Sequence, residues 1–122
     1  MDNNSFTDSR RHLRYDIMDF AMIYGASHPQ GVRALVVDLG LGGIAIRSRE
    51  ALEADEKIRI QIGKSGGTPY ELNGQVRYCD NGQSNPLYSI GIQFEPANHE
   101  EKISIARLIN EAFQRSCKQN SA

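Results

Sequence analysis

Apolar and polar residues alternate along most of the chain between residues 17 and 94. A period of two is typical of β-strands that bury one face in a core. The pattern predicts six strands, at residues 17–24, 32–37, 44–49, 57–62, 70–79 and 88–94. In the first of these, one face carries four large apolar side chains: Met18, Phe20, Met22 and Tyr24.

The third predicted strand shows the alternation most clearly, with Ile44 and Ile46 expected inward and Arg47 and Arg49 outward. Clusters of glycine, proline and asparagine between the strands predict turns. These turns occupy residues 25–31, 63–69 and 80–86, and 63–69 is predicted as a long hairpin loop. Residues 50–56 form a polar connection that could contain one helical turn.

The hydrophobic period changes after Pro96, where a helix is predicted. Asn98 followed three residues later by Glu101 matches a capping box. The apolar positions that follow have helical spacing: Ile105, Leu108, Ile109, Ala112 and Phe113. Arg115 and Lys118 would complement the dipole at the helix end. This helix is expected to cover an open end or face of the sheet.

Six strands followed by one helix indicate a mainly β fold, either an antiparallel barrel or a strongly curved sheet closed by the helix. The chain has 122 residues, which suits one domain. Residues 1–9 are polar and are expected to form a flexible arm. The folded domain is expected over residues 10–117, and residues 118–122 are expected to be a disordered tail.

The net charge is −1, so nothing global favours nucleic acid or an anionic membrane as partner. No apolar run approaches the roughly 18 residues of a membrane span, and the N-terminus lacks the form of a secretion signal. Cys79 and Cys117 have no metal-like spacing and are expected to be free packing residues. These observations predict a cytoplasmic protein without membrane insertion.

Catalytic and cofactor patterns are weak. Gly40–Ala45 formally fits a dinucleotide-binding fingerprint, but the glycines lead into a predicted strand rather than the helix which that site needs. His12, His28 and His99 lie in three separate contexts. The acid pairs lie in a connection and in the first turn of the predicted helix. We therefore predict no enzymatic activity, no catalytic residues, no metal and no cofactor.

Two local features carry the remaining chemistry. Arg10, Arg11 and Arg14 form a basic segment before the first strand, which taken alone is most simply a solvated stretch of chain. Asp38 and three glycines, ending at Gly43, form a tight connection between two strands. Such a run of glycines suggests positive φ angles or the close approach of another molecule.

These two features together resemble the bacterial PilZ domain. Arg10-Arg11-His12-Leu13-Arg14 carries its R-x-x-x-R pattern, and Asp38-Leu39-Gly40-Leu41-Gly42-Gly43 resembles its [D/N]-x-S-x-x-G pattern. The resemblance covers the chain from about residue 8. It implies a six-stranded antiparallel β-barrel with a C-terminal α-helix packed on it. It also implies binding of the second messenger cyclic di-GMP between the arginine arm and the polar turn.

The residue chemistry agrees with this ligand. Arginine can bind phosphate oxygens bidentately and can hold or stack on guanine, which suits Arg10, Arg11 and Arg14. Asp38 can accept hydrogen bonds from the N1–H and N2 amino edge of guanine. Gly43 would let the backbone approach the ring. Gly40 replaces the serine of the family pattern, and one lost hydrogen bond costs about 0.5–1.5 kcal/mol.

Two functions follow from this resemblance. The first is a stand-alone receptor that binds cyclic di-GMP and then signals to a protein partner in motility, secretion or polysaccharide export. The second is a degenerate adaptor that binds such a partner but no nucleotide, which the replacement of serine by Gly40 would favour. Nucleic acid is not expected as a partner, because three clustered arginines make a small electrostatic footprint.

Overall fold

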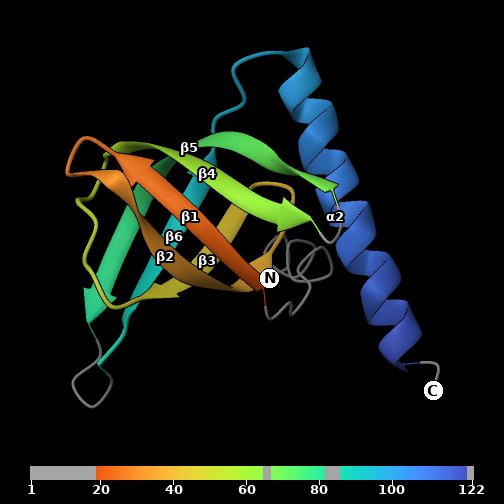
Figure 1. The fold of residues 1–122 in the computed structure, drawn as a ribbon, viewed down its shortest axis with the longest axis horizontal. Coiled ribbons are helices and arrows are strands. Elements are labelled where there is room, and N and C mark those ends of the chain that lie inside the picture. The colour runs from red at the N-terminus through yellow and green to blue at the C-terminus, as the bar shows by residue number, and fades with distance from the viewer. Residues whose placement is uncertain (1–18, 65–66, 82–85, 121–122) are drawn as a thin grey trace, which may run out of the picture.

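A computed structural model describes residues 19–64, 67–81 and 86–120. Arg10, Arg11, Arg14 and the expected arm 1–9 lie outside the described residues. The strands close into an antiparallel barrel in the order β1-β2-β3-β6-β5-β4, with β4 pairing back to β1 (Figure 1). Their bounds are β1 Asp19–Gly25, β2 His28–Leu39, β3 Gly43–Ser48, β4 Lys57–Lys64, β5 Gly67–Asn81 and β6 Tyr88–Phe94. The predicted mainly β barrel with a C-terminal helix is confirmed.

Alternate residues of each strand fill the barrel. The interior is built mainly from branched aliphatic side chains, including Ile23, Ile46, Ile60, Leu72 and Ile90, which are essentially inaccessible to solvent. Branched side chains suit strands because they pack well on a pleated surface. Burying this apolar surface is the main source of stability for such a domain.

The large side chains of strand β1 face outward. Ala21 and Ile23 are buried, whereas Phe20 is 51% exposed and Met22 and Tyr24 are only partly buried. The period of two was predicted correctly, but it does not say which face is inside. The closed barrel accepts small Ala21 inside and leaves the bulkier face outside. By contrast, Ile44 and Ile46 point inward as predicted.

Strands β2, β4 and β5 are longer than predicted. β5 begins at Gly67, which pairs with Lys64, so the loop predicted at 63–69 is short. Asp80 and Asn81 belong to β5 and pair with β6, although they were expected in a turn. Residues 50–56 contain no helical turn: Asp55 adopts a left-handed φ of 68°, and Leu52 is buried.

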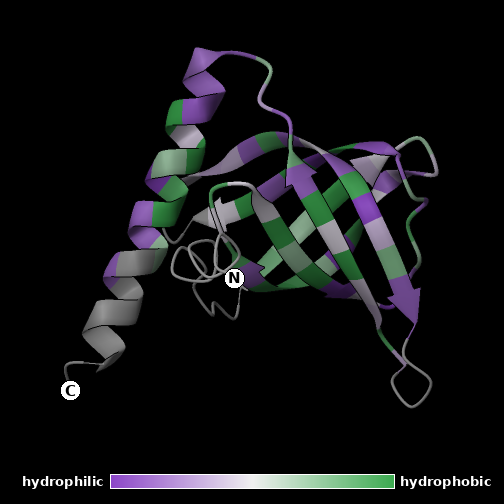
Figure 2. Ribbon diagram, turned by 180° about the vertical axis from the view of Figure 1, so that it is seen from behind, coloured by the Kyte–Doolittle hydropathy of each residue, from purple (hydrophilic) through white to green (hydrophobic). Residues whose placement is uncertain are grey.

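Helix α2, His99–Asn120, lies beside the barrel and contacts β5 (Figure 1). The Asn98 side chain caps it by accepting a hydrogen bond from the Glu101 N–H at 2.8 Å, as predicted. Its apolar stripe is buried as expected, with Ile105, Leu108, Ile109 and Ala112 against the core. Along the strands and the described part of α2, hydrophobic residues alternate with hydrophilic ones (Figure 2). The helix continues to Asn120, so residues 118–120 are helical rather than part of the expected tail.

Polar contacts from two acidic residues of the helix attach it to β5. Glu101 is buried, and its carboxylate accepts hydrogen bonds from the backbone N–H of Asn73 at 2.6 Å and from Asn73 Nδ2 at 2.8 Å. Tyr70 donates a hydrogen bond of 2.7 Å to Glu111. Within the described residues, no helix is long and apolar enough to cross a membrane.

Candidate functional site

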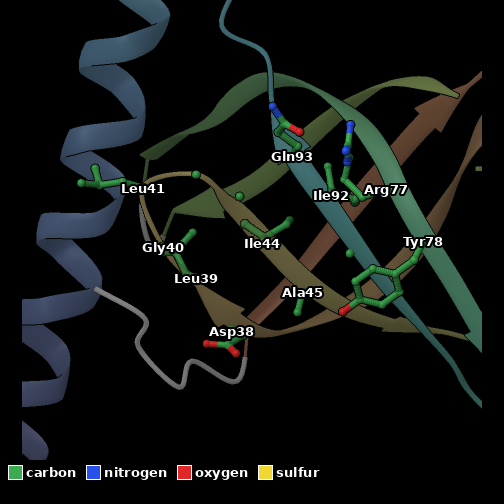
Figure 3. A pocket seen from close by; sticks show the side chains of 13 residues that line it. Asp38, Leu39, Gly40, Leu41, Ile44, Ala45, Arg77, Tyr78, Ile92 and Gln93 are labelled. Carbon is green, nitrogen blue, oxygen red and sulfur yellow. The ribbon is translucent and has the colours of Figure 1, made fainter. Parts of the chain in front are cut away.

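A pocket of about 520 Å³ lies where the β2–β3 turn meets the outer surface of β5 and β6 (Figure 3). Its first wall is the continuous segment from Asp38 to Ala45. The opposite side is formed by residues of β5 and β6: Arg77, Tyr78, Gly91, Ile92 and Gln93. The pocket therefore joins the glycine-rich turn to residues more than thirty positions later in the chain.

The pairing register of four strands brings the pocket together. Asp38 pairs with Ala45, Ala45 pairs with Gly91, and Gly91 pairs with Tyr78. This row, which we call the trough, runs across β2, β3, β6 and β5. Two small residues form its floor, and a carboxylate and an aromatic ring stand at its ends, as Figure 3 shows for the labelled residues.

Irregularities in β2 and β5 place the two ends of the trough on the outer face. The register shifts between Val36 and Asp38 in β2, and between Val76 and Tyr78 in β5. A bulge inserts one residue and so reverses which side chains face outward beyond it. Val36 and Val76 are fully buried, yet Asp38 and Tyr78, two residues further along, line an outer pocket.

The Tyr78 ring lies directly over Gly91. A Cβ atom at position 91 would overlap three carbon atoms of that ring, so glycine lets the ring lie in this position. Tyr78 is 51% exposed, although large aromatic side chains usually bury more of their surface. One face of the ring therefore rests on the strand backbone, and the side chain remains accessible from the pocket.

The glycine-rich turn is held by backbone hydrogen bonds. Gly40 N–H donates to the Gly43 carbonyl at 3.0 Å, and Phe94 N–H donates to the Gly42 carbonyl at 2.9 Å. A Cβ atom on Gly43 would overlap the carbonyl oxygen of Ile92, so glycine is needed there for close contact with β6. Among the described residues, positive φ occurs only at Gly31 and Asp55. Gly43 thus serves close approach, and the turn glycines do not adopt a left-handed backbone.

Comparison with known proteins agrees with this geometry. Residues 8–111 match the model of the PilZ domain. The chain belongs to the PilZ family. No curated protein matches the chain in sequence.

Several solved structures share the fold. The PilZ domain of YcgR from Escherichia coli, solved with c-di-GMP, has a TM-score of 0.72 at 14% identity, over 88% of this chain and 94% of that one. The PilZ domain of CeSA from a cellulose-synthesizing bacterium has a TM-score of 0.65 at 18% identity, over 80% and 95%. The inhibitor of motility MotI/DgrA from Bacillus subtilis has a TM-score of 0.66 at 17% identity, over 87% of this chain. The present PilZ chain spans about half of MotI/DgrA, 50% of its length.

Three of the predicted site residues of this PilZ domain, Asp38, Gly40 and Gly43, line one pocket. The predicted arginines, Arg10, Arg11 and Arg14, lie outside the described residues, so their place relative to the pocket stays a prediction. Sequence reasoning missed the far wall, which includes Arg77, Tyr78 and Gln93. The signal in the sequence that could have indicated this wall is Gly91 in β6, which lies opposite the aromatic residue Tyr78 of β5.

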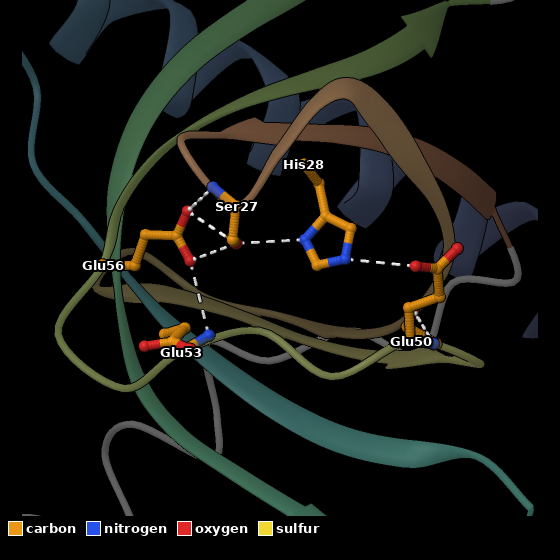
Figure 4. Close-up of polar contacts among 6 residues, drawn as sticks. Ser27, His28, Glu50, Glu53 and Glu56 are labelled. Carbon is orange, nitrogen blue, oxygen red and sulfur yellow. Dashed lines mark hydrogen bonds and ion pairs between the residues drawn. The ribbon is translucent and has the colours of Figure 1, made fainter.

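A second polar cluster joins the β1–β2 turn to the connection before β4 (Figure 4). Ser27 Oγ lies 3.1 Å from His28 Nδ1, and His28 Nε2 lies 3.1 Å from Glu50 Oε1. This hydroxyl–imidazole–carboxylate order resembles a nucleophilic triad. However, Ser27 Oγ donates to Glu56 at 2.8 Å, so its proton is directed to a carboxylate and not to the imidazole. The cluster lies at the opposite end of β2 from the pocket.

Glu56 is the centre of this second cluster. Burial raises its pKa, but hydrogen bonds from the Ser27 N–H and hydroxyl and the Glu53 N–H, together with nearby His28, leave the pKa below the ordinary value of 4.5. The contacts favour the ionised carboxylate and fasten the hairpin to the connection. No three metal-binding side chains come together in the described ranges 19–64, 67–81 and 86–120. We interpret the cluster as structural.

Proposed function

We propose that this PilZ domain is a non-enzymatic receptor for cyclic di-GMP. The observation that carries the proposal is the trough, in which motif residue Asp38 faces Tyr78 across a floor of Ala45 and Gly91. The trough offers a hydrogen-bond acceptor and an aromatic face within one pocket, and a purine base uses both. The structure of the related YcgR PilZ domain with c-di-GMP supports the same ligand class.

Each part of the ligand would have its own partner. Asp38 would accept hydrogen bonds from the N1–H and N2 amino group of one guanine, and Tyr78 would stack on the base. The guanidinium groups of Arg10, Arg11 and Arg14 would hold the phosphates and the O6/N7 edge of guanine. Gly40 and Gly43 would shape the turn beside the ligand. Closure of the arginine arm on the ligand would alter the surface presented to a partner.

We place this receptor in the cytoplasm, where it would signal to a protein in motility, secretion or polysaccharide export. Ordering a charged segment around a ligand is an established way to create or remove a docking surface. The signal would require no chemical step. The proposal therefore assigns no catalytic residue, and cyclic di-GMP is a ligand rather than a cofactor.

The rival function is an adaptor that binds a partner but no nucleotide. Gly40 favours it, because the serine hydroxyl of the family pattern is missing from the pocket wall. The loss costs about 0.5–1.5 kcal/mol, or up to about tenfold in affinity. Loss of one such hydrogen bond weakens binding but does not abolish it, so we prefer the receptor.

Isothermal titration of the purified protein with cyclic di-GMP tests the proposal, with GTP and cyclic GMP as control ligands. We expect saturable binding that Arg14→Ala and Asp38→Ala each weaken by about 1–3 kcal/mol. Arg59→Ala removes an exposed arginine on β4 away from the pocket; it is the matched control and should leave affinity unchanged.

Gly40→Ser should tighten binding, because it restores the serine hydroxyl of the family pattern. The φ angle at Gly40 is not positive, so a serine is compatible with its backbone. Absence of binding at high ligand concentration would favour the adaptor.

A further inference from the structure

A second row of outward-facing side chains runs beside the trough. Phe20 of β1 pairs with Leu35 of β2, and Leu35 pairs with Arg47 of β3. Arg33 precedes Leu35 by two residues within β2, so strand alternation puts both on the same face, and Arg49 follows Arg47 by two, just beyond the end of β3 at Ser48. We call these five residues the arginine patch. Arg33 and Arg49 are exposed, and Arg47 is half-buried.

No ion pair between described residues neutralises the positive charges of the arginine patch. The ion pairs between described residues join His28 to Glu50 and Lys57 to Glu95. None involves Arg33, Arg47 or Arg49. Like charges on neighbouring strands repel one another, which disfavours the folded state. A cluster of this kind on a domain with a net charge of −1 is more readily explained by a partner than by stability.

The patch has the composition of a protein-binding surface. The Arg33 guanidinium carbon lies 4.4 Å from the centre of the Phe20 ring, and this ring is 51% exposed. Arginine and aromatic residues supply much of the binding energy of protein interfaces, and they cluster near an apolar interface centre. Leu35, half-buried between Phe20 and Arg47, would supply part of that centre.

Nucleic acid fits the patch less well. Three arginines would release few counterions, and sequence-independent binding to nucleic acid depends on many phosphate contacts. The apolar centre between the arginines would face a charged phosphate backbone and would bury no apolar surface against it. A protein segment carrying carboxylates with an apolar residue between them matches both the charge and the centre of the patch.

We propose that the arginine patch docks an acidic segment of a partner protein, and that cyclic di-GMP in the trough weakens this docking. Arg47 lies two residues from Ala45, the floor of the trough, on the same outer face of β3. Their separation along the strand is about 7 Å, within the roughly 8 Å over which charges act at physiological salt. A ligand with two phosphates would therefore lower the positive potential of the patch. This second step rests on the proposed function, whereas the docking itself does not.

Fluorescence anisotropy with a labelled peptide of alternating glutamate and leucine tests the docking step on the ligand-free protein. We expect saturable binding that the triple variant Arg33→Gln, Arg47→Gln, Arg49→Gln weakens by about tenfold or more. The control variant Arg59→Gln, Lys102→Gln, Arg107→Gln loses the same charge from exposed positions outside the patch and should change affinity less than about twofold. Equal losses in both variants, or no saturable binding, would overturn the docking proposal.

Two further probes complete the docking test. A labelled duplex DNA should bind weakly and without dependence on the patch; patch-dependent binding of DNA but not of the peptide would overturn the acidic-protein assignment. Circular dichroism checks that each variant is folded. If the triple variant does not fold, Arg33→Gln with Arg49→Gln, both exposed, replaces it and should still weaken peptide binding.

The ligand step is tested by repeating the peptide titration with saturating cyclic di-GMP. We expect the apparent dissociation constant for the peptide to rise by about threefold to tenfold. Nucleotide bound in calorimetry without any change in peptide affinity would overturn the release step alone. Absence of nucleotide binding would overturn the proposed function together with the release step, and the docking step would still be decided by the peptide titration.

Discussion

Gly43 packs against the backbone of β6 more closely than any other residue type could. The carbonyl oxygen of Ile92 occupies the place where its Cβ would stand. Gly42 beside it has open space around the same position, with nothing within 4 Å. Packing therefore requires glycine at position 43, but it does not require glycine at the adjacent position 42.

At the residue scale we predict that Gly43→Ala lowers the free energy of unfolding by about 1–3 kcal/mol, because the added methyl must displace strand β6. Gly42→Ala is the matched control. Its φ is not positive, and replacing glycine restricts the unfolded chain, so its stability should be unchanged or up to about 1 kcal/mol higher. Urea denaturation followed by circular dichroism measures both variants. Equal destabilisation of the two would show that the turn, and not the contact with β6, is sensitive.

Helix α2 is positioned by polar contacts as well as by its apolar stripe. Glu101 accepts hydrogen bonds from Asn73 and, at 3.2 Å, from the backbone N–H of Ala97. One carboxylate thus satisfies donors from β5 and from the segment that enters the helix. Glu100, its neighbour, is exposed and contributes through the helix dipole, as expected for an acid in the first turn.

At the element scale we predict that Glu101→Ala costs about 2–3 kcal/mol of stability, because hydrogen bonds to a charged group are lost and the partly buried Asn73 N–H loses its acceptor. Glu100→Ala should cost less than about 1 kcal/mol. Hydrogen exchange should show the loss of protection concentrated in α2 and the adjacent part of β5. Uniform loss across the barrel would contradict an anchoring role for Glu101.

The ionisation of Tyr70, which bonds the barrel to α2 through Glu111, affects the stability of the whole domain. Burial and the hydrogen bond to Glu111 raise the pKa of Tyr70 to about 12 from its ordinary 10. A group whose pKa is higher in the folded protein stabilises the fold below its unfolded pKa. This contribution is present at neutral pH and is lost as the pH rises from 10 towards 12.

At the scale of the whole molecule we predict that Tyr70 ionises well above the ordinary tyrosine pKa of 10, and that stability decreases as it does so. Absorbance at the tyrosinate band, recorded with increasing pH, should show a late step that Tyr70→Phe removes. In Tyr70→Phe, stability should also depend less on pH in the interval from 10 to 12. Retention of the late step in the variant would assign it to another tyrosine.

Local sequence determined the secondary structure and the motif. Strand periodicity, the Asn98 cap and the apolar stripe of α2 depend on neighbouring residues, so they could be predicted without knowing the fold. The glycine-rich turn was identified in the same way, and its residues Asp38, Gly40 and Gly43 line the pocket. The bounds of the strands were harder to predict, because β5 extends to Asn81 through pairing with β6 and not through its own composition.

Only the tertiary structure decided which face of β1 is inside and what stands opposite the motif. Phe20 faces outward because barrel closure places Ala21 and Ile23 inside, a choice that alternation alone does not make. The placement of Asp38 and Tyr78 at the two ends of one pocket depends on register shifts in two strands and on a glycine beneath the tyrosine ring. Register is set by contacts between distant segments, so the far wall of the pocket could not be predicted from the pattern of either strand.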